Sequence, residues 1–416
     1  MEYGLIGEKL GHSFSKQIHG SIDDYDYILK EIPKDEVAAF MEKRDFKGIN
    51  VTIPYKETVI PMLDEIDETA AEIGAVNTVV NRNGKLKGFN TDAEGMKAML
   101  LREGMDFKDK KVLILGTGGT SKTALYVSKK LGAKQVFRVS RSEKDGCITY
   151  DEAYSAHSDA NFIINTTPVG MYPETSKCPV ESERFKNLSG VADAIFHPLR
   201  SNLILEAEAR GIKACGGLYM LAGQAVYART HFLGLKETDT KLIQKAYREV
   251  LKGVRNIVLI GMPSCGKSTV GKEIMRATGL PLFDTDSEIV KRIGCSISDF
   301  FKEKGEKEFR RIEREVIAEL SKNGGKIIST GGGAVLDPMN VRELKRDGII
   351  IFIDRSIDRL TPTADRPLLQ NREMLEKLFK DRYGIYKAAA DVTIDGNGSI
   401  TENTKRVLAA ADLENI

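Results

Sequence analysis

The segment from Gly261 to Thr269 matches the phosphate-binding pattern GxxxxGK[ST] at every defined position. Glycines let backbone N–H groups curl around a phosphate, and a helix that follows adds the favourable end of its dipole. Lys267 would reach the β- and γ-phosphates, and the Ser268 hydroxyl would take a coordination position on Mg²⁺. We therefore expect ATP and Mg²⁺ at a loop that comprises Ser264, Cys265, Gly266, Lys267, Ser268 and Thr269.

Carboxylates and arginines follow this loop along the chain. Asp284 and Asp286 end an apolar segment that predicts a strand, and their spacing would place both on one side of it. One carboxylate could hold Mg²⁺, while the other could bind a substrate hydroxyl. Further along lie Arg310, a glycine turn that contains Gly332, Arg366 and Arg382. Taken singly, each arginine is more simply explained as a solvated surface charge.

A second glycine-rich turn, from Gly116 to Ser121, gives a weaker indication of a dinucleotide. Ser121 occupies the third glycine position of the GxGxxG pattern. The next predicted strand leads into Ser140, Arg141 and Ser142, where an NAD site usually has an acidic residue. An arginine there suits the additional 2′-phosphate of NADP, although a surface arginine after a strand is the simpler alternative.

The elements that must position these residues alternate between short β-branched segments and helical patterns, which favours an α/β architecture with parallel sheets. The clearest predicted strands are 111–115, 162–165, 256–260, 326–329 and 348–353. Two of them lead directly into the glycine turns at Gly116 and Gly261, so two separate nucleotide-binding domains are expected. An amphipathic helix is predicted over 240–251, with Gly253 as its stop and a new strand near Asn256.

Composition restricts the class of protein further. The 416 residues carry 62 Lys and Arg against 60 Asp and Glu, a net charge of +2 that indicates neither nucleic acid nor a membrane surface as a partner. The five cysteines are scattered and form no CxxC pair, so neither a disulfide scaffold nor a cysteine metal site is expected. No apolar segment approaches the roughly 20 residues of a membrane span. We expect a soluble cytoplasmic protein, and the oligomeric state stays open.

From about Val254 onward, the chain resembles shikimate kinase. The resemblance covers, in order, the phosphate loop, the Asp284-x-Asp286 pair, the Gly-Glu-x-x-Phe-Arg segment ending at Arg310, the triple glycine 331–333, Arg366-Pro-Leu-Leu and Arg382-x-x-x-Tyr386. It implies that shikimate is held by Asp286, Arg310, Gly332 and Arg382. It also implies that Asp284 works near Mg²⁺ and the attacking hydroxyl, and that Arg366 covers ATP from a lid. Arginines suit the carboxylate of shikimate.

Residues 1 to about 250 resemble shikimate dehydrogenase. The matching clusters are 12–16, 50–56, 74–78, 88–92, 165–171, 193–198 and 216–224. The resemblance implies that the substrate is surrounded by Ser13, Ser15, Thr52, Asn77, Asp92 and Gln224. It implies NADP binding by Gly116, Thr117, Gly118, Gly119, Thr120, Ser140, Arg141, Ser142 and Gly217. Phe196 stands where many relatives have tyrosine, so one hydroxyl contact with the substrate is missing.

The same resemblance places Lys56 and Asp92 nearest the proton transfer, and their chemistry agrees. Hydride delivery to a ketone builds negative charge on oxygen, so a cation with a transferable proton lowers the barrier. Lys56 can supply both, as the acid in reduction and the base in oxidation. Asp92 can orient the lysine while it binds a hydroxyl.

Together these features predict three domains. They are an α/β substrate-binding domain at 1–102 with about 225–250, a Rossmann-type NADP-binding domain at 103–224, and a P-loop domain like the nucleoside-monophosphate kinases, with a parallel sheet, at 254–416. The expected function is NADPH-dependent reduction of 3-dehydroshikimate, followed by ATP-dependent phosphorylation of shikimate to shikimate 3-phosphate, in the synthesis of chorismate and aromatic amino acids. Three alternatives stay open: quinate as the dehydrogenase substrate, a kinase-like module that is regulatory, and another small polyol as phosphate acceptor.

Overall fold

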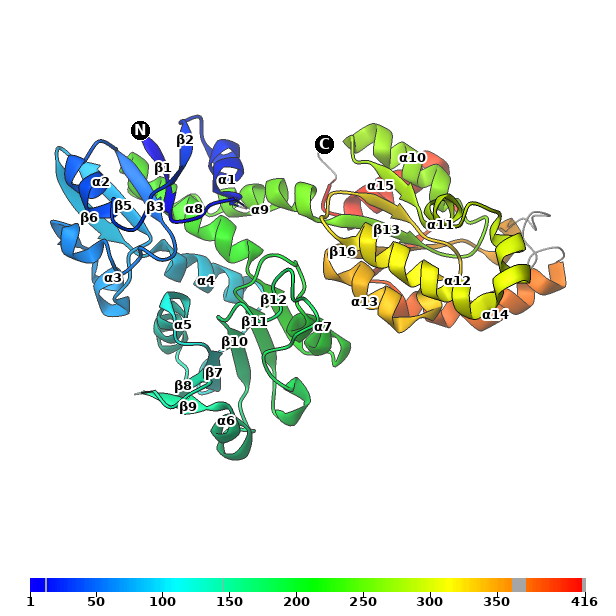
Figure 1. Ribbon diagram of the computed structural model, residues 1–416, viewed down its shortest axis with the longest axis horizontal. Coiled ribbons are helices and arrows are strands. Elements are labelled where there is room, and N and C mark those ends of the chain that lie inside the picture. Colours follow the sequence, from blue (N-terminus) through cyan, green and yellow to red (C-terminus); the bar gives the residue numbers. More distant parts are fainter. Residues whose placement is uncertain (12, 145, 361–371, 414–416) are drawn as a thin grey trace. The chain divides into compact units, whose positions relative to one another are not determined.

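The computed structural model describes residues 1–11, 13–144, 146–360 and 372–413 (Figure 1). The chain divides into two units, Met1–Val250 and Leu251–Ile416. Within the described ranges, no helix is both long and apolar enough to cross a membrane.

The first sheet of the N-terminal unit mixes parallel and antiparallel strands. Across the sheet, the order is β2 (Tyr27–Glu31), β1 (Tyr3–Gly7), β3 (Gly48–Val51), β5 (Thr78–Arg82), β6 (Lys85–Phe89) and β4 (Glu65–Ile66). β5 and β6 form an antiparallel hairpin whose turn residues Asn83 and Gly84 have φ of 53° and 85°. This is the conformation of a type I′ turn. The prediction of parallel sheets was wrong for this sheet, because a two-residue turn joins antiparallel strands.

The second sheet is parallel throughout. Its order is β12 (Lys213–Gly216), β11 (Gly190–Asp193), β10 (Phe162–Asn165), β7 (Lys111–Leu115), β8 (Gln135–Ser140) and β9 (Cys147–Thr149). The strand order reverses between β7 and β10. In open α/β sheets, ligands bind outside the carboxyl ends of the strands at such a reversal. The loops after β7 and β10 are therefore the expected place for a dinucleotide.

The helices of the N-terminal unit join these strands and cover the sheets. They are α1 (Ser15–Ile22), α2 (Val37–Lys43), α3 (Glu68–Ile73), α4 (Thr91–Arg102), α5 (Gly119–Lys130), α6 (Tyr150–Ala156), α7 (Asn202–Ala209) and α8 (Leu218–Leu233), with short 3₁₀ turns at Ile60–Met62 and Ser182–Arg184. Helix α9 (Lys241–Val254) begins in this unit and ends in the next one along the chain.

Helices α4 and α8 approach each other closely where both carry glycine. A Cβ added to Gly95 would lie 2.5 Å from the Met220 carbonyl oxygen, and one added to Gly223 would lie 3.0 Å from the Gly95 Cα. This approach matters for the site because Asp92 is in the first turn of α4 and Gln224 is on α8. The domain border predicted at residue 224 falls inside α8, and we propose to assign the whole helix to the substrate-binding domain.

The C-terminal unit is built on a parallel sheet with the order β14 (Leu282–Asp284), β15 (Ile327–Ser329), β13 (Asn256–Ile260), β16 (Gly348–Asp354) and β17 (Val392–Asp395). Its helices are α10 (Lys267–Thr278), α11 (Thr285–Ile293), α12 (Ile297–Ser321), α13 (Pro338–Arg346), α14 (Arg372–Ala389) and α15 (Ile400–Ala410), with 3₁₀ turns at Ala334–Leu336 and Ile357–Arg359.

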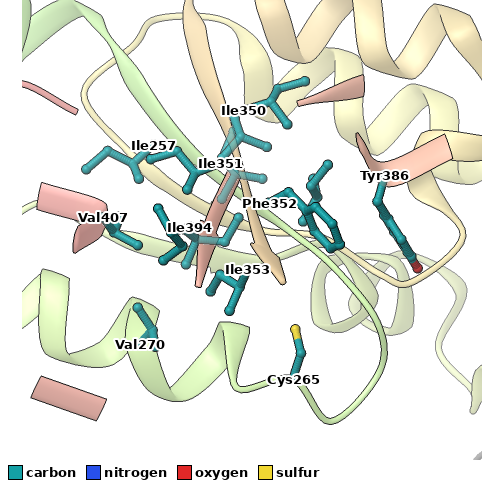
Figure 2. Packing of buried hydrophobic residues seen from close by; sticks show 14 of the residues in the cluster. Ile257, Cys265, Val270, Ile350, Ile351, Phe352, Ile353, Tyr386, Ile394 and Val407 are labelled. Carbon is teal, nitrogen blue, oxygen red and sulfur yellow. The ribbon is translucent and has the colours of Figure 1, made fainter. Parts of the chain in front are cut away.

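The core of this unit explains why its strands are apolar on both faces. Ile350, Ile351, Phe352 and Ile353 of β16 are all buried, because helices cover both sides of a parallel sheet. Figure 2 shows these side chains among others from the helices. Cys265 of the phosphate loop and Tyr386 of α14 belong to the same cluster. The core therefore fixes two elements that carry the kinase site.

Helix α9 extends beyond its predicted end. Gly253 was expected to stop the helix, but α9 continues to Val254, and Arg255 still donates its N–H to the Leu251 carbonyl at 2.9 Å. Leu251 and Val254, which belong to the C-terminal unit, form a buried face at helical spacing. Packing of that face outweighs the modest helix penalty of an interior glycine, about 1 kcal/mol.

Candidate active sites

The centre of the first site is an ion pair between a loop residue and a helix terminus. Lys56 lies in the turn region after β3, and Asp92 lies in the first turn of α4. Lys56 Nζ donates to Asp92 Oδ2 at 2.6 Å, and the two side chains are 19% and 12% exposed. The N-terminal end of α4 favours a carboxylate at this position. The ammonium is thus held in one place while part of it stays accessible to a substrate.

Asn77 fixes the start of α4. Its Oδ1 accepts the Thr91 N–H at 2.7 Å, and its Nδ2 donates to the Thr91 hydroxyl oxygen at 3.0 Å. Asn90 caps the same helix by accepting the Ala93 N–H at 3.2 Å. Because Asp92 follows Thr91 directly, these bonds also position the carboxylate that holds Lys56.

The predicted substrate residues surround one cavity of about 450 Å³. Lys56 and all six predicted substrate residues line it: Ser13, Ser15, Thr52, Asn77, Asp92 and Gln224. Two predicted NADP residues, Thr120 and Gly217, border the same cavity. A small molecule with several hydroxyls fits a pocket of this size with these donors and acceptors.

Sequence reasoning missed two further polar residues at this cavity. Asn50 lines it, donates to the Thr78 hydroxyl at 3.0 Å and accepts the Tyr27 hydroxyl at 2.7 Å. Lys9 also lines it and is exposed. Asn50 begins a cluster noted in the sequence, whereas nothing in the sequence distinguishes Lys9 from any surface lysine. Phe196 lines the cavity as an apolar side chain and packs edge-on against Phe14.

The dinucleotide loop begins where β7 ends. Gly116 has φ of 112°, and a Cβ there would lie 2.8 Å from the Thr166 hydroxyl oxygen, so glycine is required. Helix α5 begins at Gly119 after Gly118, and Thr117 and Thr120 lie in the same loop and first turn. The residue at the third glycine position, Ser121, is fully buried. The loop and helix start therefore present backbone N–H groups to an anion.

The other predicted NADP residues lie at the same edge of the sheet. Ser140 ends β8 and accepts the Ser142 N–H at 3.4 Å, and Arg141 between them is exposed. The Gly116 N–H donates to the Val139 carbonyl at 3.0 Å, which ties the two loops together. A Cβ at Gly217 would lie 2.2 Å from the Ala194 carbonyl oxygen, so this position also requires glycine.

The carboxyl group of Asp193, the first residue of the matching cluster 193–198, is buried and supports this edge. Asp193 ends β11, and its Oδ2 accepts the Ser201 hydroxyl at 2.6 Å. Burial raises the pKa of Asp193 to about 7, although its hydrogen bonds to Ser201, Ile195 and Asn165 act in the opposite direction.

In the C-terminal unit, the phosphate loop has the backbone that its sequence predicts. Ser264 and Gly266 have φ of 64° and 101°, and Lys267 begins α10. The buried Lys267 Nζ donates to the carbonyl oxygens of Gly261 at 2.9 Å and Met262 at 3.1 Å. Within the loop Cys265 is buried, and Thr269 is exposed on the first turn of α10.

Three oxygen-bearing side chains gather beside this loop. The Asp284 Oδ2 accepts hydrogen bonds from Ser268 at 3.3 Å and from Ser329 at 3.1 Å. Hydroxyl and carboxylate oxygens suit Mg²⁺, which usually takes its other ligands from phosphates and water. Ser329, at the end of β15, was not predicted, because only the strand order brings it next to Asp284.

The prediction that Asp284 and Asp286 share one side of a strand was wrong. β14 ends at Asp284, which caps helix α11 by accepting the Ser287 N–H at 3.2 Å. Asp286 lies in the first turn of that helix, and its Oδ1 is 2.1 Å from the place a Cβ would take on Gly331. The helix turn thus separates the two carboxylates, one toward Ser268 and the other toward the triple glycine.

The predicted acceptor residues converge on residues 331–333. Arg382 Nη1 donates to the Gly332 carbonyl at 2.9 Å, and the Tyr386 hydroxyl donates to the same oxygen at 2.6 Å. Arg310 Nη1 lies 2.6 Å from the position of a Cβ on Gly333. Asp286, Arg310, Gly332 and Arg382 therefore border one region. Arg366 lies outside the described residues.

Glu313 is a further residue of this region that the sequence did not indicate. It is 1% exposed, and its Oε2 accepts Arg310 Nη1 at 2.7 Å. Burial raises the pKa of Glu313, while the neighbouring Arg310 acts to lower it. Glu313 therefore holds the guanidinium on the side of the triple glycine.

Fold and sites define the class of the protein: a nucleotide-dependent oxidoreductase unit followed by a P-loop kinase unit. The family model "Shikimate dehydrogenase substrate binding domain" matches residues 5–79, and "Shikimate kinase" matches residues 263–412.

Relatives of the N-terminal part agree. Shikimate dehydrogenase (NADP(+)) from Clostridium beijerinckii is 36% identical over 59% of this chain and 96% of its own. The structure of a chorismate mutase/shikimate 5-dehydrogenase fusion protein from Clostridium acetobutylicum is 35% identical, with a TM-score of 0.56 over 60% of this chain and 96% of that one. Shikimate 5-dehydrogenase from Thermus thermophilus, solved with NADP(H) and shikimate, is 28% identical, with a TM-score of 0.54 over 60% of this chain and 99% of that one.

The chain belongs to the shikimate dehydrogenase family and carries a shikimate kinase domain after it. It is a bifunctional enzyme of the shikimate pathway that uses NADP and ATP.

Proposed function

We propose that the N-terminal unit reduces the C3 ketone of 3-dehydroshikimate with NADPH and a proton, which gives shikimate and NADP⁺. The C-terminal unit then phosphorylates the new C3 hydroxyl with ATP, which gives shikimate 3-phosphate, ADP and a proton. The observation that carries this proposal is the Lys56–Asp92 pair, at 2.6 Å, in a cavity lined by all six predicted substrate residues.

In the first reaction, bound NADPH supplies the hydride, and the protein supplies the proton. Lys56 donates the proton to the ketone oxygen during reduction and takes it back during oxidation. Asp92 holds the ammonium in place, and Ser13, Ser15, Thr52, Asn77 and Gln224 bind and orient the ring substituents. The Gly116–Thr120 loop binds the pyrophosphate of the cofactor, and Ser140–Ser142 bind its 2′-phosphate end. Gly217, which has no side chain, allows the cofactor to approach the backbone closely.

In the second reaction, Lys267 exchanges its loop carbonyl partners for the β- and γ-phosphates and offsets their charge. Ser268 and Asp284 hold Mg²⁺, which neutralises the phosphates when it is bound. Arg310 and Arg382 grip the shikimate carboxylate, and Asp286 binds a ring hydroxyl. Arg366 is proposed to cover ATP. The cytoplasmic location and the predicted domain division stay predictions.

The test supplies the purified chain with 3-dehydroshikimate, NADPH and MgATP and follows the products by mass spectrometry. Shikimate should form without ATP, and shikimate 3-phosphate should form with it. Lys267→Ala should still form shikimate but no shikimate 3-phosphate. Lys56→Ala should form neither product from 3-dehydroshikimate, yet it should still phosphorylate shikimate that is added directly, so each variant is the control for the other.

Two outcomes would contradict the proposal. Shikimate that is formed but never phosphorylated would show that the C-terminal unit is regulatory or acts on another acceptor. A failure to consume NADPH would reject 3-dehydroshikimate, and quinate with NADP⁺ or NAD⁺ would be tested next.

A further inference from the structure

The charges that line the dehydrogenase cavity do not cancel. Among the described residues that line it, the charged ones are Lys9, Lys56 and Asp92. Asp92 offsets Lys56 at 2.6 Å. Within the described part of the chain, no carboxylate forms an ion pair with Lys9. The cavity therefore carries one net positive charge, and that charge belongs to Lys9.

Lys9 lies on a wall that is well fixed by hydrogen bonds. The next residue, Leu10, donates its N–H to Glu31 Oε1 at 2.7 Å and accepts the Ser13 N–H at 3.0 Å. The Ser15 N–H in turn donates to the Ser13 hydroxyl oxygen at 3.2 Å. The segment that carries Lys9 thus also carries two hydroxyls that line the same cavity, Ser13 and Ser15.

The substrate needs a cation of this kind. The proposed substrate has a carboxylate on a ring carbon separate from the one that reacts, and its ketone must face Lys56. An anion that leaves water for a protein cavity requires a compensating charge, which hydroxyl groups alone do not supply. An ammonium group provides both the charge and a strong hydrogen bond.

We propose that Lys9 binds the substrate carboxylate, together with the hydroxyls of Ser13 and Ser15, and makes the site selective for the anionic substrate. This inference rests on the proposed dehydrogenase function. Lys9 is a specificity residue that takes no part in the proton transfer, because Lys56 serves that role. Its contribution is made equally in the bound substrate and in the transition state, so it lowers KM and leaves kcat unchanged.

The experiment measures shikimate oxidation by NADP⁺ with the full chain and its Lys9→Gln, Lys9→Arg and Lys16→Gln variants. Lys16 is the matched control, because it is an exposed lysine of the same segment that does not line the cavity. A second substrate, the methyl ester of shikimate, keeps the ring and removes the charge.

We expect Lys9→Gln to raise the KM for shikimate about tenfold, the effect of one lost charge-assisted contact, with kcat changed less than about twofold. The KM for the methyl ester and for NADP⁺ should stay unchanged. Lys9→Arg should recover most of the shikimate affinity, and Lys16→Gln should behave like the unmodified chain.

Three results would overturn this inference and leave the proposed function intact. They are an unchanged KM for shikimate in Lys9→Gln, an equal rise in KM for shikimate and its methyl ester, or the same rise in KM in Lys16→Gln. If the unmodified chain fails to oxidise shikimate, the proposed function falls and this inference with it. The two failures are therefore distinguishable within one set of assays.

Discussion

The Asp193 carboxyl oxygen Oδ1 accepts a hydrogen bond from Asn165 Nδ2 at 3.0 Å, which joins the carboxyl ends of the neighbouring strands β11 and β10. The same oxygen accepts the Ile195 N–H at 3.0 Å. The Ile195 carbonyl, in turn, accepts the Gly217 N–H at 2.8 Å. One buried carboxyl group thus organises the sheet edge that faces the proposed NADP site.

This carboxyl group should make the stability of the N-terminal unit depend on pH. Burial raises the pKa of Asp193 from 3.8 to about 7. As the pH rises from about 4 to about 7, the unfolded chain loses this proton while the folded chain keeps it, so the free energy of unfolding falls. Above about pH 7 both states are ionised, and this contribution becomes constant.

The measurement is calorimetry of the unmodified chain and of Asp193→Asn at several pH values. The transition that NADP⁺ shifts upward belongs to the N-terminal unit. Its temperature should fall from about pH 5 to about pH 7 by more in the unmodified chain than in the variant, which cannot ionise here. Identical pH profiles would refute the assignment.

Asp92→Asn should reduce the rate of dehydrogenation while it leaves the kinase reaction intact. The change removes the charge that holds Lys56 at 2.6 Å, so the proton donor is no longer fixed toward the substrate. We expect kcat to fall about 10²-fold or more, the range for a misplaced general acid. Glu94→Gln is the matched control, because Glu94 is another acid in the first turn of α4. Equal losses in both variants would speak against a special role for Asp92.

Gly217→Ala should destabilise the NADP side of the first site. The added Cβ would lie 2.2 Å from the Ala194 carbonyl oxygen, and this contact is with rigid backbone. We expect a loss of about 1–3 kcal/mol in the free energy of unfolding and a higher KM for NADPH. Gly20→Ala, in α1, has open space at its Cβ and is the control. An unchanged NADPH KM in Gly217→Ala would exclude a close approach of the cofactor.

The parts of the fold and sites that can be predicted from sequence are those where the local backbone conformation requires particular residue types. The phosphate loop needs positive φ and a helix start at fixed spacing, and Ser264, Gly266 and Lys267 meet that demand. The Asn83–Gly84 pair likewise meets a local requirement, because this pair is typical of the type I′ turn that joins β5 and β6. The start of α11 also has a local signal: Asp284 is a typical N-cap residue, and the acidic residues Asp286 and Glu288 follow it in the first turn. This signal places Asp286 on a helix, whereas Asp284 ends the strand before it.

Other site residues depend on contacts that no local pattern contains. Ser329 meets Asp284 only because β15 pairs with β14. Glu313 supports Arg310 from within one helix, but its burial depends on how α12 packs. Lys9 becomes a cavity residue only when the segment after β1 folds beside Thr52 and Asn77. For such residues, the sequence supplies the side chain and the tertiary fold supplies the role.

Ser329→Ala should raise the Mg²⁺ concentration that the kinase reaction requires. The Ser329 hydroxyl donates to the Asp284 Oδ2 at 3.1 Å, so its loss frees the carboxylate to rotate. Loss of a supporting partner of a metal ligand typically weakens metal binding about 10-fold or more. Half-saturating Mg²⁺ should rise accordingly, while the KM for shikimate stays constant. Ser296→Ala, which removes the cap of α12, should lower stability without this effect.

Glu313→Gln should weaken shikimate binding in the kinase reaction. Arg310 contacts two carboxylates: Glu313, which is buried, and Glu306, whose side chain is 67% exposed. Removing the charge of Glu313 leaves Glu306 as the stronger partner, which draws the guanidinium away from the triple glycine and toward solvent. We expect the KM for shikimate to rise about tenfold, since a partly buried charged hydrogen bond is worth about 1.5–3 kcal/mol, with the KM for ATP unchanged.

Glu306→Gln separates this positioning effect from a general loss of negative charge around Arg310. It removes a charge from the same guanidinium, but from the exposed side, where an ion pair contributes little. Its shikimate KM should therefore stay the same or fall slightly, because Arg310 is then held by Glu313 alone. If both variants raise the KM equally, Arg310 responds to total charge, and Glu313 has no positioning role. If only Glu313→Gln does so, the buried carboxylate orients the arginine that the substrate meets.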